Sequence, residues 1–315
     1  MDSRASAKNK ELIIVRLLGG LGNQMFQYAL GRHLALIHNK PLKLDLSAYR
    51  PSGRSSRWVF RSYGLGHFNI QKSVAEDAEL KPFKKYLRLT FFSRLLRRVS
   101  AYGKYYARGY IFEPPGRNFT FDPWLLDAPL KSVVYLDGFW QSEKYFKAVE
   151  GIIRNDFSFK KPPDVANQQM LEEIASVDSV AIHIRHGDNA TKIARHHGVL
   201  PLKYYKNAVS ELAKTISNPN FYIFSDDPAW AKANLKLNHP ATFVTHNGEA
   251  KHQEDLRLMS HCKHHIIGNS TFSWWGAWLG KQPNQLVYAP KRYHMRVNIP
   301  IKDLYPGEWK LMDID

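Results

Sequence analysis

Apolar runs and helical segments alternate regularly along the second half of this chain. The pattern predicts short strands over residues 180–184, 222–225, 242–245, 265–268 and 286–289, and helices over 202–214, 228–235, 254–262 and 272–279. Consecutive strands separated by helices are typical of parallel pairing, because a parallel connection must cross from one end of the sheet to the other. We therefore expect an α/β fold with a parallel sheet covered by helices on both faces.

The first half begins in the same way and then loses this rhythm. Residues 11–18 predict a strand, residues 19–24 a glycine-rich turn, and the following residues a helix to about His38. Later elements are expected as strands over 41–46 and 132–136 and a helix over 142–153. From about Arg50 to Pro129, proline, glycine, aromatic and basic residues predict an insertion or a system of loops.

Residues 160–164 carry paired prolines beside lysines, which predicts a linker. A chain of 315 residues also exceeds the roughly 250–300 residues at which a single core stops growing. We expect two domains, residues 1–160 with a long insertion around 50–130, and residues 161–315.

Composition limits the partners and the compartment. The net charge of +17 indicates an anionic partner, which could be nucleic acid, a membrane surface or a phosphorylated small molecule. Cys262 is the single cysteine, which excludes an internal disulfide and suits a reducing compartment. The apolar run at 12–18 is short and interrupted by Arg16, so we expect neither a signal peptide nor a membrane span, and a cytoplasmic location.

A basic segment follows Lys81, with no acidic residue over 81–112. Its lysines and arginines interleave with apolar residues, as in an amphipathic helix lying on an anionic membrane, here the inner face. An ordinary helix with a solvated face fits the pattern equally well.

The strand over 180–184 runs into polar residues that packing does not require. His183, Arg185 and Asp188 fall at its carboxyl end, where open α/β sheets bind ligands. The planar, permanently charged guanidinium of Arg185 suits a diphosphate. Asp188 is a candidate base for an acceptor proton, although a strand-end aspartate more often orients a neighbouring arginine.

Two turns share one plan, in which a strand is followed by a helix start that offers free N–H groups to an anion. In the first turn, the amides of Asn23 and Gln24 follow the glycines and can donate to phosphate oxygens. In the second, Asn269, Ser270 and Thr271 stand in a row, although one of them suffices to cap the helix. Tight connection and capping are the alternative interpretations.

Asp226 and Asp227 precede Pro228 at a third strand end. Either is most simply a helix N-cap with proline at the first helical position, and the alternative is contact with a base or ribose. A divalent-cation site is also conceivable here, but the abundant cationic side chains make a metal less necessary, and we expect none. We assign Trp274, Trp275 and Trp278 to the core.

Four motifs together resemble a known family. They are GGLGNQMFQYA at 19–29, HIRHGD at 183–188, FYIFSDD at 221–227, and DLRLMS at 255–260 with NSTFSWWGAWL at 269–279. The chain resembles the bacterial α-1,2-fucosyltransferases, with residues 50–129 weakly covered. The resemblance implies a GT-B-like architecture of two Rossmann-type domains with a cleft between them.

The same resemblance implies inverting transfer of L-fucose from GDP-fucose to the 2-hydroxyl of a galactose in a glycan acceptor, without metal or another cofactor. It places GDP-fucose on the C-terminal domain and the acceptor on the N-terminal side, in lipopolysaccharide or O-antigen biosynthesis. Arg185 matches the arginine that holds the diphosphate, and Asn23 matches an amide near the sugar nucleotide. His186 stands where the family has a second arginine.

The expected donor-binding residues are Gly22, Asn23, Gln24, His183, Arg185, Asp226, Asn269, Ser270, Thr271 and Phe272. Ser270, Thr271 and Phe272 match the segment beside the phosphates and ribose, and His183 and Asp226 are candidates for contacts to guanine or ribose. The expected catalytic residues are Arg185 and Asp188.

Two alternatives stay open. A transferase for another nucleotide sugar would keep the diphosphate-binding groups and differ in its sugar pocket. A basic nucleic-acid-binding protein would explain the charge, but the sequence has no helix-turn-helix, zinc-finger spacing or RNA-binding signature, so we expect no nucleic-acid partner.

Overall fold

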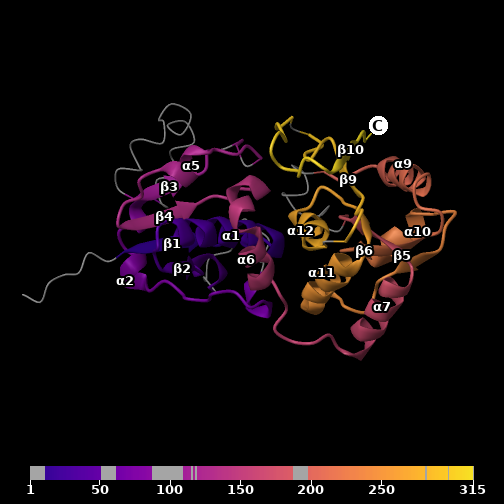
Figure 1. The fold of residues 1–315 in the computed structure, drawn as a ribbon, viewed down its shortest axis with the longest axis horizontal. Helices are drawn as coiled ribbons and strands as arrows, with labels where there is room; N and C mark the ends of the chain where they lie inside the picture. The colour runs from indigo at the N-terminus through magenta and orange to yellow at the C-terminus, as the bar shows by residue number, and fades with distance from the viewer. Residues whose placement is uncertain are drawn as a thin grey trace, which may run out of the picture. The chain divides into compact units, whose positions relative to one another are not determined.

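The computed structural model describes residues 11–50, 62–86, 109–114, 116–117, 119–186, 198–280, 282–296 and 298–314. The chain divides into two compact units, of which one ends at Phe157 and the other begins at Ser158 (Figure 1). Each unit contains its own parallel sheet with helices, so the predicted α/β class is confirmed.

The first unit is built on a four-stranded sheet in the order β2-β1-β4-β3, and every pairing within it is parallel. Its strands are β1 (Leu12–Arg16), β2 (Leu42–Asp45), β3 (Tyr110–Phe112) and β4 (Val133–Asp137). Its α-helices are α1 (Leu21–Ile37), α2 (Asp77–Leu80), α5 (Trp124–Asp127) and α6 (Glu150–Asp156). Short 3₁₀ turns are η1 (Ser47–Tyr49), η2 (Leu65–His67), η4 (Glu143–Tyr145) and η5 (Lys147–Val149).

One predicted helix of this unit is wrong in form. Residues 142–153 do not make one helix but two 3₁₀ turns and the start of α6. The break lies at Phe146, whose φ of −141° is incompatible with helix and whose side chain is fully buried. Core packing of this ring takes precedence over helical periodicity. β3 and α5 were also missed, because they lie in the segment predicted to be irregular.

Helix α1 and an aromatic cluster cover opposite faces of the first sheet. A Cβ at Gly31 would lie 2.2 Å from Cγ2 of Val15, so glycine allows α1 to approach β1 closely. On the other face, Tyr135 stacks with Phe83 and Tyr110 at centroid distances of 4.9 and 5.7 Å. Packing on both faces holds the first sheet in place, and polar residues follow the carboxyl ends of its strands.

The second unit is built on a six-stranded parallel sheet in the order β10-β9-β8-β5-β6-β7. Its strands are β5 (Asp178–Ile184), β6 (Pro219–Ser225), β7 (Ala241–Phe243), β8 (His264–Ile266), β9 (Val287–Pro290) and β10 (Lys310–Met312). Its helices are α7 (Val165–Ser176), α9 (Leu202–Ala213), α10 (Pro228–Asn234), α11 (His252–His261) and α12 (Thr271–Leu279), with the 3₁₀ turn η7 (Glu249–Lys251). Helix α7 and strand β10 were not predicted.

Helices cover both faces of this second sheet. Val180 and Ile182 of β5 belong to a core cluster that includes residues of α9 and α10. Alternate residues face the other way: the hydroxyl of Tyr222 donates to Glu173 of α7 over 2.9 Å, and α11 packs on both α7 and α12. The tryptophans Trp274, Trp275 and Trp278 of α12 are buried, as predicted.

The winding of this sheet reverses at its centre. Starting from β5 and counting along the chain, the strand order is 3-2-1-4-5-6, the doubly wound order of Rossmann-type sheets. The point of reversal lies between β5 and β8, and such sheets bind ligands outside the carboxyl ends of the strands at this point. The sequence places His183, Arg185 and residues 268–272 there. None of the described helices is both long and apolar enough to cross a bilayer.

Candidate active site

Arg185 and Asp226 lie side by side at the carboxyl edge of the second sheet. Ile184 pairs with Ser225 in the parallel register of β5 and β6, so the residues that follow leave the sheet together. Nε of Arg185 lies 3.8 Å from Oδ2 of Asp226, and each side chain is 30% exposed. The guanidinium is therefore oriented by a carboxylate and still reaches solvent, where an anion can bind it.

His186 is held against the start of α10. Its backbone N–H donates to Oδ1 of Asp226 over 2.7 Å, its Nδ1 lies 3.0 Å from Oδ2 of Asp227, and its ring stacks on Trp230 at 3.8 Å. Asp227 accepts a hydrogen bond from the Trp230 N–H and caps α10, which confirms the capping interpretation for this residue. This hydrogen bond and the contact with His186 lower the pKa of Asp227.

His183 is buried at the switch point. Burial lowers its pKa to about 4; the positive charge of Arg185 acts in the same direction and Asp226 opposes it. The ring lies 5.7 Å from that of Phe272, the second residue of α12. Its Nδ1 has no hydrogen-bond partner among the described residues. A buried polar atom of this kind usually gains a partner from a ligand or water.

The turn between β8 and α12 needs a glycine. A Cβ at Gly268 would lie 2.9 Å from the backbone oxygen of His183 and 3.1 Å from the hydroxyl of Tyr205. Ser270 caps α12 by accepting a hydrogen bond from the N–H of Phe272. The amide of Asn269 donates to the backbone oxygens of Gly198 and Tyr293 over 3.1 and 3.0 Å, so it fastens two neighbouring segments.

Two tyrosines complete this cluster, and neither was predicted. The backbone of Thr271 forms a hydrogen bond with Tyr293; burial raises the pKa of this phenol, and that bond and the nearby charge of Arg185 act against the rise. Burial also raises the pKa of Tyr205, and the negative charge of Asp226 adds to it. Both are neutral hydroxyl groups beside Arg185 or Asp226, and no local pattern in the sequence marks them.

The second unit thus brings together His183, Arg185, Asp226 and the start of α12 from residues that are far apart in sequence. A guanidinium and a helix N-terminus with its positive dipole are the groups that bind phosphate oxygens. Asp188 lies outside the described residues. Among the described residues, no group of three or more His, Cys, Asp or Glu is placed to hold a metal ion.

The glycine-rich turn of the first unit is held from within. Gly19 has a φ of +78°, and α1 begins at Leu21, inside the segment 19–24 that was predicted as a turn, so the turn is shorter than expected. Gln24 is fully buried, donates to the backbone oxygens of Gly19 and Ser62, and accepts from the N–H of Gly64. The hydrogen bonds of the Gln24 amide are therefore made to backbone groups. Gln24 would affect a ligand indirectly, by fixing the conformation of the turn.

Gln27 and Asn23 connect the same turn to the end of β4. Gln27 accepts from the N–H of Leu18 over 2.9 Å and donates to the oxygen of Gly138 over 3.0 Å. Oδ1 of Asn23 accepts from the amide of Gln141 over 2.8 Å. Asn23 and Gly22 lie in the first turn of α1, so these contacts set the direction of the Asn23 side chain.

A doubly wound sheet with an arginine and a helix start at its switch point is typical of α/β proteins that bind nucleotides. The model described as Glycosyl transferase family 11 matches residues 103–311, which is more than half of the chain. The chain belongs to this family and is a glycosyltransferase. The predicted resemblance to the α-1,2-fucosyltransferases is confirmed at the level of the family.

Two relatives from Escherichia coli match most of the chain. The alpha-1,2-colitosyltransferase is 30% identical over 308 residues, which cover 95% of this chain and 98% of the relative. The O-antigen biosynthesis glycosyltransferase WbnK is 31% identical over 296 residues, which cover 88% and 93% of the two chains.

Solved fucosyltransferases share the fold. A mutant of Arabidopsis thaliana FUT1 in complex with GDP aligns with a TM-score of 0.50 and 11% identity, covering 90% of this chain and 71% of that one. NodZ alpha-1,6-fucosyltransferase co-crystallized with GDP aligns with the same score and 14% identity, covering 89% and 95%. These matches agree with the predicted architecture of two Rossmann-type domains.

Proposed function

We propose that this protein transfers L-fucose from GDP-fucose to the 2-hydroxyl of a galactose in a glycan acceptor, with inversion at the anomeric carbon. The observation that carries the proposal is the pairing of Arg185 with Asp226 at the carboxyl ends of β5 and β6, next to the switch point between β5 and β8. This arrangement offers an oriented guanidinium and helix N–H groups to a diphosphate, in a chain of glycosyltransferase family 11.

In an inverting transfer, the acceptor hydroxyl attacks the anomeric carbon in line as GDP departs. The main electrostatic task is then to stabilise the charge that develops on the leaving diphosphate. Arg185 and the start of α12 supply positive charge for this task without a cation. Asp226 orients the guanidinium of Arg185, which is the alternative role that we considered for Asp188. We retain Asp188 as the candidate base.

The proposed donor-binding residues of the second unit are His183, Arg185, Asp226, Asn269, Ser270, Thr271 and Phe272. Gly22, Asn23 and Gln24 of the first unit are proposed to contribute to binding of the same nucleotide sugar. Asn269 and Gln24 would act by holding backbone segments, since their amides donate to backbone oxygens. Thr271 and Asn23 stand at helix starts and are partly exposed.

A second donor is favoured by one specific observation, the 30% identity with an alpha-1,2-colitosyltransferase. Colitose lacks one hydroxyl of fucose, so a pocket that hydrogen-bonds this hydroxyl would discriminate between the two sugars. The site residues named above bind the GDP part in either case. The choice between the donors depends on the contacts of the sugar ring.

Turnover of GDP-fucose, GDP-colitose, GDP-mannose and UDP-galactose with lactose as acceptor tests the proposal. We expect product from GDP-fucose, and two-dimensional NMR of the product should show an α-linked sugar on the 2-hydroxyl of galactose. Preference for GDP-colitose would change the donor but keep the mechanism. Turnover only with UDP-galactose, or a different linkage, would contradict the proposed function.

We propose a cytoplasmic enzyme that contacts the anionic inner face of the membrane through the basic segment that begins at Lys81. Most of that segment, residues 87–108, lies outside the described residues. Co-sedimentation with vesicles containing anionic phospholipid tests the contact. Binding that falls steeply as salt rises would support it.

A further inference from the structure

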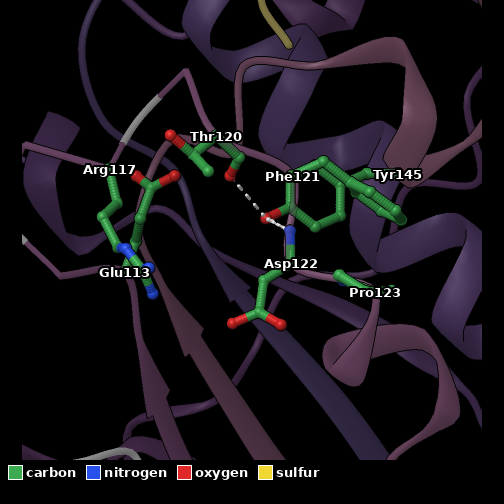
Figure 2. Close-up of a pocket in the computed structure, with 7 residues that line it drawn as sticks. All are labelled: Glu113, Arg117, Thr120, Phe121, Asp122, Pro123 and Tyr145. Carbon is green, nitrogen blue, oxygen red and sulfur yellow. Dashed lines mark hydrogen bonds between the residues drawn. The ribbon is translucent and has the colours of Figure 1, made fainter. Parts of the chain in front are cut away.

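The first unit contains a cavity that the donor site does not use. Its volume is about 230 Å³, and it lies at the carboxyl edge of the sheet, where Glu113 follows β3 directly. Figure 2 shows Glu113 and Arg117 on one side of it, the rings of Phe121 and Tyr145 on the other, and Asp122 between them. The lining residues are Glu113, Arg117, Thr120, Phe121, Asp122, Pro123 and Tyr145.

The carboxylate of Glu113 is held by the segment that follows β4. The N–H groups of Phe139 and Trp140 donate to Oε2 and Oε1 over 2.8 and 2.9 Å. Trp140 has a φ of +46°, a conformation that is rare for a bulky residue, and a Cβ at Gly138 would lie 2.4 Å from Cβ of Glu113. The backbone at 138–140 is thus shaped around this side chain.

This environment also changes the charge state of Glu113. Burial raises its pKa to about 7, Asp137 contributes in the same direction, and the two N–H donors oppose the shift. Each carboxylate oxygen accepts one of these hydrogen bonds and retains a second lone pair for another donor. The group is therefore oriented in advance and can accept a hydrogen bond from a bound molecule.

The opposite wall is rigid and aromatic. The rings of Phe121 and Tyr145 meet edge to face with centroids 4.9 Å apart. The hydroxyl of Tyr145 accepts from the N–H of Asp122 over 3.0 Å and donates to the oxygen of Thr120, as the dashed lines in Figure 2 show. These bonds fix the segment that presents Asp122 and the Phe121 ring to the cavity.

Two carboxylates, one guanidinium and aromatic rings around a small cavity suit a sugar ring. Sugar hydroxyls donate to carboxylates in charge-assisted hydrogen bonds, and the C–H groups of the ring pack on aromatic side chains. The volume is below the roughly 300–1,000 Å³ of pockets for drug-sized ligands, which points to a single ring. A phosphate fits less well, because Glu113 and Asp122 would repel it.

We propose that this cavity binds one sugar ring of the acceptor saccharide, with Glu113 and Asp122 accepting hydrogen bonds from its hydroxyl groups. The inference rests on the proposed function, since it assigns the acceptor of that reaction a place on the first unit. The competing explanation is that Glu113 serves only to satisfy the N–H groups of Phe139 and Trp140.

Charge-neutral variants separate these explanations. Glu113→Gln and Asp122→Asn keep the shape of each side chain and replace one acceptor oxygen with an NH2 group. In Glu113→Gln this group faces the N–H of Phe139 or Trp140, so its KM is read together with its Tm. Asp122→Asn can keep its hydrogen bond from the N–H of Trp124 and is the more direct test. Asp127→Asn is the matched control, because Asp127 is an exposed carboxylate in the adjacent helix α5. Arg117→Met removes the guanidinium that lines the cavity. Arg154→Met is its control, because Arg154 pairs with Glu150 on α6 and does not line the cavity.

The measurements are KM for lactose, KM for GDP-fucose, GDP affinity by calorimetry and Tm. We expect Glu113→Gln and Asp122→Asn to raise KM for lactose about tenfold or more, because each replaces an oxygen that accepts from a sugar hydroxyl with an NH2 donor. Arg117→Met should raise it by a smaller factor. KM for GDP-fucose, GDP affinity and the two control variants should stay within about twofold of wild type.

A KM for lactose within twofold of wild type in folded Glu113→Gln and Asp122→Asn would overturn the proposal. A lower Tm for Glu113→Gln with unchanged lactose KM would assign Glu113 the structural role alone. Saturation-transfer NMR with lactose in the absence of donor measures acceptor binding without turnover, so failure of the cavity proposal can be told apart from failure of the proposed function. If lactose binds to wild type but not to Asp122→Asn, and wild type does not turn over GDP-fucose, only the donor assignment is contradicted.

Discussion

Nε of Arg185 lies 3.8 Å from Oδ2 of Asp226, and this pair joins the carboxyl ends of β5 and β6. A second pair, Asp178 with Lys263 at 3.0 Å, lies at the opposite end of β5. Both pairs are partly exposed, but only the first stands at the edge where a doubly wound sheet binds its ligand. The second pair therefore provides matched controls for variants of the first.

Arg185→Ala should lower kcat/KM with GDP-fucose by about 100- to 1,000-fold, the usual cost of removing one preorganised donor to developing charge. Arg185→Lys should recover part of this loss, because lysine keeps the charge but not the planar fork. Lys263→Ala is the control and should retain wild-type turnover. Steady-state kinetics on variants with unchanged Tm checks this, and near-normal turnover of Arg185→Ala would refute the assignment.

Asp226→Asn should weaken GDP binding by about tenfold, because it removes the charge that orients Arg185. The asparagine oxygen can still accept from the N–H of His186, so the backbone there should keep its position. Calorimetric titration with GDP measures the effect, and Asp178→Asn is the control. Equal affinities for the two variants would show that the Asp226 charge does not act on the ligand.

His186→Arg should fold normally and bind GDP several-fold more tightly. An arginine can stack on Trp230 and pair with Asp227 as the histidine does, and it adds a permanent positive charge beside Arg185. The comparison is His186→Gln, which removes the ring that stacks on Trp230 and adds no charge. If His186→Arg binds GDP more weakly than wild type, the histidine has a role of its own at this position.

Buried His183 should make the protein less stable in mild acid. Its pKa of about 4 in the folded protein lies below the usual value of about 6.5, so between these pH values the unfolded chain binds more protons. Stability should therefore be complete above pH ~6.5 and fall as pH decreases toward ~4, by on the order of 2–3 kcal/mol from this residue. Chemical unfolding at several pH values measures it, and His183→Asn should show a shallower decline over the same window.

Chelator should leave turnover unchanged. Arg185 and the start of α12 supply positive charge at the place proposed for the diphosphate, so the mechanism does not call for a divalent cation. Activity is to be measured after dialysis against EDTA, with and without added Mn²⁺ or Mg²⁺. A steep loss that manganese restores would overturn this expectation.

The regular half of the fold was predictable because its signals are local. The run around Ile182, the cap at Ser270 and the glycine turn before α1 each show a strand end or a helix start within a few residues. Helix α7 had such a signal as well, since Asp164 caps it, and the neighbouring prolines obscured it. β3 gave no clear signal because it lies inside the segment without a strand–helix rhythm, and β10 gave none because its three residues are mostly exposed and form no apolar run.

The same limit applies to the site. Arg185 was predictable from its strand, and Asp226 from the turn that follows β6. Tyr205 and Tyr293 were not, because only the folded sheet brings a residue of α9 and a residue after β9 to the end of β5. The two hydrogen bonds that hold the Glu113 carboxylate were not predictable either. Their donors, the N–H groups of Phe139 and Trp140, lie more than twenty residues further along the chain.

Strand β10 determines how this protein should be handled. It pairs with β9 at the border of the second sheet, and Ile314 beyond it belongs to the central core. Deleting the last six residues would leave the backbone N–H and C=O groups on one side of β9 without their β10 partners. An edge strand with unpaired backbone groups can pair with other chains and cause aggregation. Purification tags are therefore better attached at the amino terminus, and trimming the carboxyl terminus for crystallisation would cost solubility.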